Sequence, residues 1–262
     1  MKASVVIAAL LLAPALAAPA VGQFPMQVPG TDVYLDGAPD RVFDLVMQGH
    51  TINLQGYPGD GLPAGAGLVL EAYLGDRVQF TVAVPATAEP HTFHLHGHPW
   101  FAPTVGRMVD TWLLHPGDVH SFSVVAGGID GNAGDWMFHC HLATHAASGM
   151  WGIFRVYPYR SVIPPILPGP QRGGAFDVHL DRLGVPVDGA HLMVQVDGKP
   201  LPAQVTPLGG GAYRVGADLP ATGVLVVTAH HPDLGVSVAR VGLGGTPVPP
   251  LTAQMDAMAH AA

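Results

Sequence analysis

The sequence predicts an all-β protein built from two β-sandwiches in tandem. Of its 262 residues, 48% are hydrophobic and only 11% are charged, so the chain can form a core and lacks the composition of a disordered protein. Its 34 glycines and 26 prolines are typical of many short strands joined by tight turns. In residues 77–84 every second residue is a valine or a phenylalanine, and this strict alternation predicts a half-buried strand.

The start of the chain has the pattern of an export signal. A lysine follows Met1, residues 5–12 are apolar, and Ala15-Leu16-Ala17 is a small-residue cleavage pattern. We therefore predict a signal peptide over residues 1–20 and an exported protein, periplasmic or extracellular. The alternative is an uncleaved anchor, but the apolar run is too short to span a bilayer and no later stretch could do so.

The first predicted sandwich covers residues 24–157. It begins with a polar lead-in, residues 24–40, and contains no convincing amphipathic helix. Its expected strands are residues 41–47, 67–73, 77–84, 91–96, 121–125, 136–141 and 150–157.

A stretch dense in proline and glycine, residues 158–174, is predicted to be a linker because proline is excluded from central strands. A small Ig-like β-sandwich is expected over residues 175–245, and it faintly resembles the YtkA-like β-domains of bacterial envelope proteins. Its expected strands are residues 176–180, 191–196, 212–215, 224–229 and 236–241. Residues 246–262 are predicted to be a flexible tail.

Net charge and cysteine content limit the partners and the chemistry that can be expected of the chain. A net charge of −8 argues against nucleic acid and anionic membranes as partners. The single cysteine, Cys140, cannot form an internal disulfide, so its thiol is free, intermolecular or a metal ligand. Nine of the 15 histidines fall between residues 91 and 145, and a cluster of histidines around a cysteine indicates a metal site.

Two motifs carry the predicted metal chemistry: residues 91–98 (HTFHLHGH) and residues 139–145 (HCHLATH), with a methionine five residues after the second. A blue copper site needs two imidazoles and a thiolate in a trigonal plane, with a weak axial thioether. The predicted type 1 copper ligands are therefore His91, Cys140, His145 and Met150.

The strand period separates these ligands from four other histidines. Residues two apart on a strand share a face, so Cys140 points to one face and its two neighbours point to the other. In the first motif His91 would face inward, toward the type 1 site. The outward-facing histidines would be His94, His96, His139 and His141.

Residues 41–157 resemble the C-terminal cupredoxin domain of multicopper oxidases, most closely the second domain of small two-domain laccases. The matching segments are residues 91–100, Val109-Asp110 and 134–152. Copper nitrite reductases share the type 1 pattern but lack the histidine that matches His141. The resemblance implies a cupredoxin-like Greek-key β-sandwich, copper as cofactor, and an exported laccase-like oxidoreductase.

The same resemblance assigns roles to the outward histidines. It makes His94 a type 2 copper ligand and His96, His139 and His141 type 3 ligands, so that His139, Cys140 and His141 carry electrons between the sites. The family's trinuclear cluster takes eight histidines, and no H-x-H pair occurs outside the two motifs at residues 91–98 and 139–145. The chain would therefore supply half of a cluster that a second copy or a partner cupredoxin chain completes.

Other residues are open to two interpretations. His98 is expected beside the site rather than as a ligand, and His115 and His120 are expected on a loop surface. Asp110 is either a turn residue or a contact for a substrate near His145. Trp136 and Trp151 are expected in the core; Met255, Met258 and His260 are either Cu(I) ligands or part of the tail.

We expect a small-molecule reductant or a metal ion to be oxidised at type 1 copper, with dioxygen reduced at the trinuclear site. The first alternative is a mononuclear blue-copper electron carrier without oxidase activity. The second is a copper-handling accessory protein, for which the second sandwich is the only hint.

Overall fold

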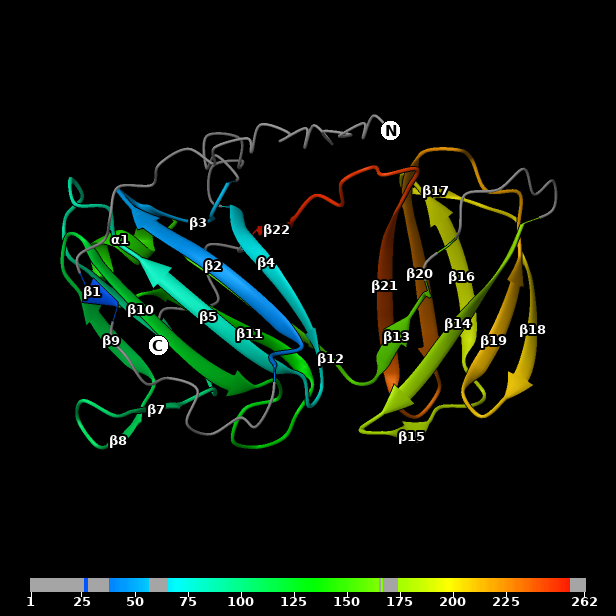
Figure 1. The fold of residues 1–262 in the computed structure, drawn as a ribbon, viewed down its shortest axis with the longest axis horizontal. Helices are drawn as coiled ribbons and strands as arrows, with labels where there is room; N and C mark the ends of the chain where they lie inside the picture. Colours follow the sequence, from blue (N-terminus) through cyan, green and yellow to red (C-terminus); the bar gives the residue numbers. More distant parts are fainter. Residues whose placement is uncertain (1–25, 28–37, 57–65, 165, 167–173, 255–262) are drawn as a thin grey trace, which may run out of the picture.

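The structure is a computed structural model that describes residues 26–27, 38–56, 66–164, 166 and 174–254. It consists of two β-sandwiches, and the predicted all-β fold is confirmed (Figure 1). The predicted signal peptide, residues 1–20, and the tail residues Met255, Met258 and His260 lie outside the described part. Within that part, no helix is long and apolar enough to cross a membrane.

The first sandwich packs a sheet of order β1-β10-β5-β2-β3 against a sheet of order β22-β4-β12-β11-β6-β9. The first sheet contains β1 (Met26–Gln27), β2 (Arg41–Gln48), β3 (Thr51–Leu54), β5 (Arg77–Ala83) and β10 (Asp118–Val125). The second contains β4 (Ala66–Tyr73), β6 (His91–Leu95), β9 (Thr111–Leu114), β11 (Gly134–Cys140), β12 (Trp151–Tyr157) and β22 (Leu251–Gln254). A short ribbon, β7 (Trp100–Ala102) and β8 (Arg107–Val109), and one helix, α1 (Ala143–Ala147), complete it.

Alternation along the strands builds the core of this sandwich. In β5 the predicted inward residues Val78, Phe80 and Val82 are fully buried, while Arg77, Gln79 and Thr81 are half-exposed. The ring of Phe80 stacks on Phe122 of β10, with centroids 5.3 Å apart, and meets Phe154 of the opposite sheet edge-on at 5.5 Å. The aromatic layer between the sheets therefore holds the strands that carry the two histidine motifs.

The second sandwich packs a five-stranded sheet against a four-stranded sheet of order β17-β16-β20-β21. The first contains β13 (Arg160–Val162), β14 (Ala175–Arg182), β15 (Val185–Pro186), β18 (Gln204–Gly209) and β19 (Ala212–Gly216). The second contains β16 (His191–Val196), β17 (Lys199–Pro200), β20 (Gly223–His231) and β21 (Gly235–Leu243). It has its own core, centred on Tyr213, Val215, Leu225 and Val227.

The predicted linker, residues 158–174, is wrong at its start. Arg160–Val162 form β13, which pairs with β14, and Tyr159 and Ser161 are buried in the second sandwich. The Ser161 hydroxyl lies 3.0 Å from that of Ser237, and Tyr159 donates a hydrogen bond to Ala229 O. The alternation of buried and exposed residues begins directly after Pro158 and was hidden by the prolines on both sides.

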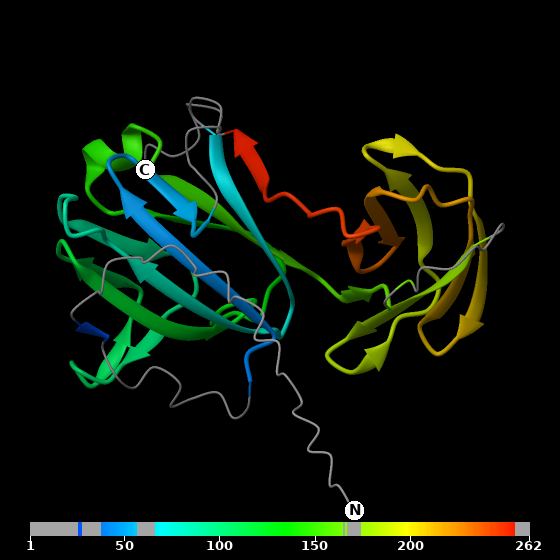
Figure 2. The same cartoon turned by 45° about the horizontal axis from the view of Figure 1, so that its top comes forward.

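The predicted flexible tail, residues 246–262, is wrong over Leu251–Gln254. These residues form β22, which pairs antiparallel with β4 of the first sandwich, Leu251 opposite Val69 and Gln254 opposite Ala66. Figure 2 shows the chain leaving the second sandwich and running back to the sheet of the first. The pairing supplies hydrogen-bond partners to the edge of β4. This stabilisation comes from a distant strand, so the sequence of residues 251–254 alone does not indicate it.

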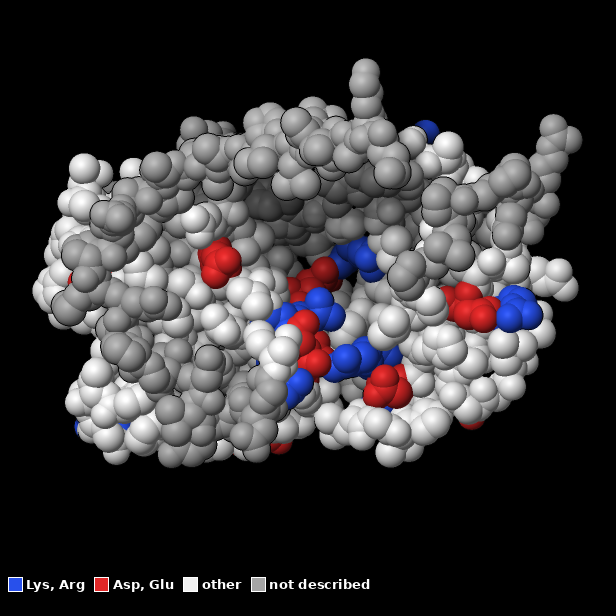
Figure 3. All heavy atoms as spheres, in the orientation of Figure 1, with Lys and Arg blue, Asp and Glu red and all other residues white. Residues whose placement is uncertain are grey.

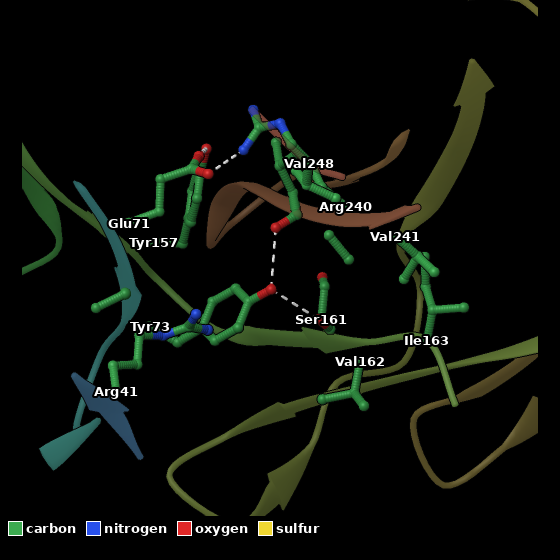
Figure 4. A pocket seen from close by; sticks show the side chains of 13 residues that line it. Arg41, Glu71, Tyr73, Tyr157, Ser161, Val162, Ile163, Arg240, Val241 and Val248 are labelled. Carbon is green, nitrogen blue, oxygen red and sulfur yellow. Dashed lines mark hydrogen bonds and ion pairs between the residues drawn. The ribbon is translucent and has the colours of Figure 1, made fainter. Parts of the chain in front are cut away.

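Charged side chains gather in the seam between the two sandwiches (Figure 3). Asp76, only 1% exposed, accepts hydrogen bonds from Arg41 of the first sandwich and from Arg160 of the second. In a nearby cavity of about 370 Å³, Glu71 pairs with Arg240, and Tyr73 places its hydroxyl 2.7 Å from Ser161 O and 3.0 Å from Val238 O (Figure 4). Ion pairs and hydrogen bonds thus fix the two sandwiches to each other.

Candidate metal centre

The inner site forms where one end of the six-stranded sheet meets a short helix. His91 begins β6, Cys140 ends β11, and His145 lies on α1, the helix that the sequence did not predict. His91 and Cys140 are fully buried and His145 is 7% exposed. Met150, also fully buried, immediately precedes β12.

The donor atoms of this site fit a trigonal copper ion. Nδ1 of His91 and Nδ1 of His145 lie 3.2 Å apart, and the Cys140 sulfur lies 3.9 Å and 3.7 Å from them. With metal–ligand bonds of the length found at zinc sites, a trigonal plane would put the donors roughly 3.6 to 3.8 Å apart. Burial, then the neighbouring His145, lowers the pKa of His91, which favours the neutral imidazole that a metal ion requires.

Backbone hydrogen bonds hold the loop between Cys140 and Met150 closed. Cys140 N donates to Met150 O, and Met150 N donates to His145 O, both at 3.0 Å. Thr92 N lies 3.5 Å from the Cys140 sulfur, in position to donate to a thiolate. The five-residue spacing from Cys140 to His145 and from His145 to Met150 therefore corresponds to a loop that contains the short helix α1 and is held by these two backbone hydrogen bonds.

The four outward histidines lie together on the opposite face of the same strands. Nε2 of His96 and Nε2 of His139 are 3.1 Å apart, and ring centroids of His94 lie 4.7 Å from His96 and 5.3 Å from His141. His94 and His139 are half-buried, whereas His96 and His141 are exposed. The structure thus brings together the four side chains that the strand period grouped.

Two of these rings are oriented by backbone carbonyl groups. Nδ1 of His94 lies 2.9 Å from Asp110 O, and Nδ1 of His139 lies 2.9 Å from Cys140 O. When each Nδ1–H donates to its carbonyl, Nε2 keeps the lone pair that a metal ion needs. The backbone carbonyl of Cys140, whose thiol belongs to the inner site, thus orients the ring of His139 in the outer cluster.

Several neighbouring residues differ from their expected places. Asp110 lies beside His94, not near His145, with its carboxylate 3.7 Å from Nδ1. His120 was predicted on a loop surface, which is wrong: it lies within β10 and is 3% exposed, because the strand starts three residues earlier than expected. His98 is buried and uses both ring nitrogens, toward His96 O and Gly127 N, as expected of a supporting residue.

The acidic residue beside the inner site is Glu89. Its carboxylate lies 3.6 Å from Nε2 of His145, and the ring of exposed His50 lies 5.1 Å from that of His145. The two ring nitrogens of His145 therefore face different groups, Nδ1 the buried donors and Nε2 the surface pair. Sequence reasoning missed both residues, because each is a single polar residue in a turn or loop far along the chain from α1.

A comparison with protein families identifies the part of the chain that carries both donor sets. A family model described as multicopper oxidase matches residues 39–160. Residues 39–160 are a cupredoxin domain of the multicopper-oxidase family. Copper is the cofactor that this multicopper-oxidase domain binds, in agreement with its thiolate and imidazole donors.

The relatives of the multicopper-oxidase domain are larger proteins. A probable nitrite reductase-hydroxylamine oxidoreductase fusion protein of Kuenenia stuttgartiensis is 35% identical over 130 residues, 45% of this chain and 15% of that protein. Laccase-2 of Oryza sativa subsp. japonica is 31% identical over 137 residues, 42% of this chain and 24% of that protein. The McoA multicopper oxidase of Aquifex aeolicus aligns with a TM-score of 0.35 at 18% identity, covering 50% of this chain and 30% of that one. The chain thus spans about a quarter or less of the length of these curated relatives.

Proposed function

We propose that the chain is an exported copper-dependent oxidoreductase of the laccase-like type, which oxidises a small reductant or a metal ion and reduces dioxygen. The observation that carries the proposal is the back-to-back arrangement of the two donor sets. The thiol of Cys140 meets His91 and His145 on one face of β11, while the flanking His139 and His141 meet His94 and His96 on the other.

In this proposal, His91, Cys140, His145 and Met150 hold one copper ion, and His94, His96, His139 and His141 hold part of a copper cluster. Bound copper would supply one-electron oxidation of the substrate and the reduction of dioxygen. The covalent path from the sulfur of Cys140 to the rings of His139 and His141 crosses the Cys140 backbone and one peptide bond in either direction. The chain itself thus provides a short electron path from the buried site to the outer face.

Oxygen uptake by the copper-loaded chain, with copper counted per chain, tests this function. His141→Ala is expected to abolish oxygen uptake and to keep the visible absorption of the inner site, because its ring lies on the opposite face from Cys140. His115→Ala, at an exposed histidine outside both clusters, is the matched control and should change neither. Undiminished oxygen uptake in His141→Ala would contradict the proposed role of the outer face.

We propose that substrates bind near Nε2 of His145, at the surface beside Glu89, and donate electrons there. With copper on Nδ1, Nε2 of His145 carries the ring proton and faces the Glu89 carboxylate. Glu89→Gln removes this negative charge and is expected to raise KM severalfold for a cationic reductant, with little effect for an anionic one. Asp130→Asn, at an exposed acidic residue in the turn after β10, is the control. Equal effects on both reductants would exclude an electrostatic role for Glu89.

Completion of the outer cluster by a second copy of the chain is part of the proposal. Each copy would contribute its four outer imidazoles about a two-fold axis, the commonest symmetry of oligomers. Leu113 and Leu142, beside the cluster, are 52% and 40% exposed, as expected of a surface that a partner covers.

Because burying imidazoles without partners is unfavourable, we expect this assembly to depend on copper. Light scattering should show dimers, or multiples of dimers, with about five copper ions per two chains, one at each inner site and three shared. A monomer with about one copper ion and no oxygen uptake would instead support the mononuclear electron carrier. The observation that favours this alternative is that the outer cluster has only four histidines within the described residues.

A further inference from the structure

A buried histidine in the first sandwich has no role in the metal centre. His120 of β10 is 3% exposed, and burial lowers its pKa to about 4, so the ring is neutral at pH 7. Its Nε2 accepts a hydrogen bond of 3.2 Å from the indole N–H of Trp100, while its Nδ1 has no partner among the described residues. A buried polar atom without a hydrogen-bond partner is unfavourable, so an apolar side chain would stabilise this position better.

Two tryptophans enclose this imidazole. The ring of Trp112, on the edge strand β9, stacks on it with centroids 4.4 Å apart and planes only 7° apart. Trp100 is 1% exposed and stacks on Phe122 at 4.0 Å, whereas Trp112 is half-buried. One indole is therefore sealed in the core, and the other reaches the edge of the sheet.

The register of the sheet connects these rings to the inner site. Cys140 of β11 pairs with Phe93 of β6, and Phe93 pairs with Trp112 of β9, so the three residues lie at one level and on one face. With strands about 4.8 Å apart, Trp112 begins roughly 10 Å from Cys140. The ring of Phe93 also lies 6.4 Å from that of Trp100. Aromatic side chains thus fill the space between the thiol and the two indoles.

We propose that Trp100, His120 and Trp112 form a redox relay that carries single electrons from the protein surface toward the copper-binding strands. An indole that loses an electron becomes a far stronger acid, and the imidazole of His120, although burial weakens it as a base, is already hydrogen-bonded to the N–H that would give up the proton. A core tryptophan with such a base is easier to oxidise than one without it.

A one-electron oxidant takes an electron from Trp100 and is reduced, while the Nε1 proton of Trp100 moves to Nε2 of His120. Trp112 then returns an electron to Trp100 as the proton moves back, and a soluble reductant at the surface gives one electron to Trp112. The oxidant would be partially reduced dioxygen, and only this choice of oxidant rests on the proposed function.

Photo-oxidation of the full chain tests the relay with an external oxidant. A soluble ruthenium photosensitiser with a sacrificial acceptor, in the absence of dioxygen, should generate a deprotonated tryptophan radical in transient absorption, with and without copper. Trp100→Phe should lose this signal, and Trp112→Phe should slow its appearance severalfold. Trp136→Phe is the matched control, because the Trp136 indole nitrogen is buried without an acceptor among the described residues, and it should leave the signal unchanged.

His120→Gln separates the redox role from a structural one. Glutamine can accept the Trp100 hydrogen bond but is not a base, so the radical should remain protonated. A deprotonated radical in His120→Gln, or one that persists in Trp100→Phe, would overturn the proposal. Trp100→Phe gives an independent result if His120→Gln does not fold. Since the experiment excludes dioxygen, its outcome does not depend on whether the chain is an oxidase.

Discussion

Cys140→Ser is expected to abolish the intense visible absorption of the copper-loaded chain. The sulfur lies 3.7 and 3.9 Å from the two imidazole nitrogens of the inner site, and a serine oxygen cannot replace the thiolate-to-copper charge transfer. Copper retained by this variant should be held by the outer histidines, which project from the other face of β11. Absorption spectra with metal analysis measure both effects.

Met150→Leu is the control for this experiment. It keeps the thiolate and both imidazoles, so the band should persist with a shifted maximum and a changed redox potential, because the axial ligand tunes a blue copper site. An unchanged spectrum in Cys140→Ser would show that the inner donors do not hold the chromophore.

Asp76→Ala is expected to lower the free energy of unfolding by about 2–3 kcal/mol, because it leaves Arg41 and Arg160 without their buried partner. The value lies below that of a fully buried pair, since both arginines are about a third exposed. The Asp76 carboxylate also accepts the backbone N–H of Tyr73, which no alanine atom can replace.

Urea unfolding followed by tryptophan fluorescence measures this loss, because all four tryptophans lie in the first sandwich. Circular dichroism reports the unfolding of both sandwiches. If the seam no longer couples them, the unfolding transition measured by circular dichroism should differ from the one measured by fluorescence. Asp177→Ala is the control: its ion pair with Arg214 is exposed, so stability should remain near that of the wild type. Equal stabilities of Asp76→Ala and Asp177→Ala would refute the coupling.

The sequence was most informative where a local period decides which way a side chain points. Alternation in β6 and β11 separated Cys140 from His139 and His141, and the structure has this arrangement. The grouping of His91, Cys140 and His145 could be predicted as well, because two of them lie in one short loop with fixed spacing.

Features that depend on contacts between distant segments could not be predicted. Glu89 and His50 reach His145 from two separate loops, and neither has a local pattern. His120 was misplaced because its burial depends on Trp112 and Trp100, which come from β9 and β7. Residues 160–162 pair with β14. Their own sequence favours a strand less strongly than the surrounding prolines indicate a linker.

The return strand β22 makes the second sandwich an insertion within the first. Leu251 pairs with Val69, so the contact spans 251 − 69 = 182 residues, and loops of this length close late in folding. Because closing this contact is less costly once the intervening residues are folded, we expect the first sandwich to be completed after the second has formed. Cutting the chain between them would leave β4 as an open edge, able to accept the same strand from another copy. Exchange of β22 between copies would link two molecules without any change at the copper-binding face.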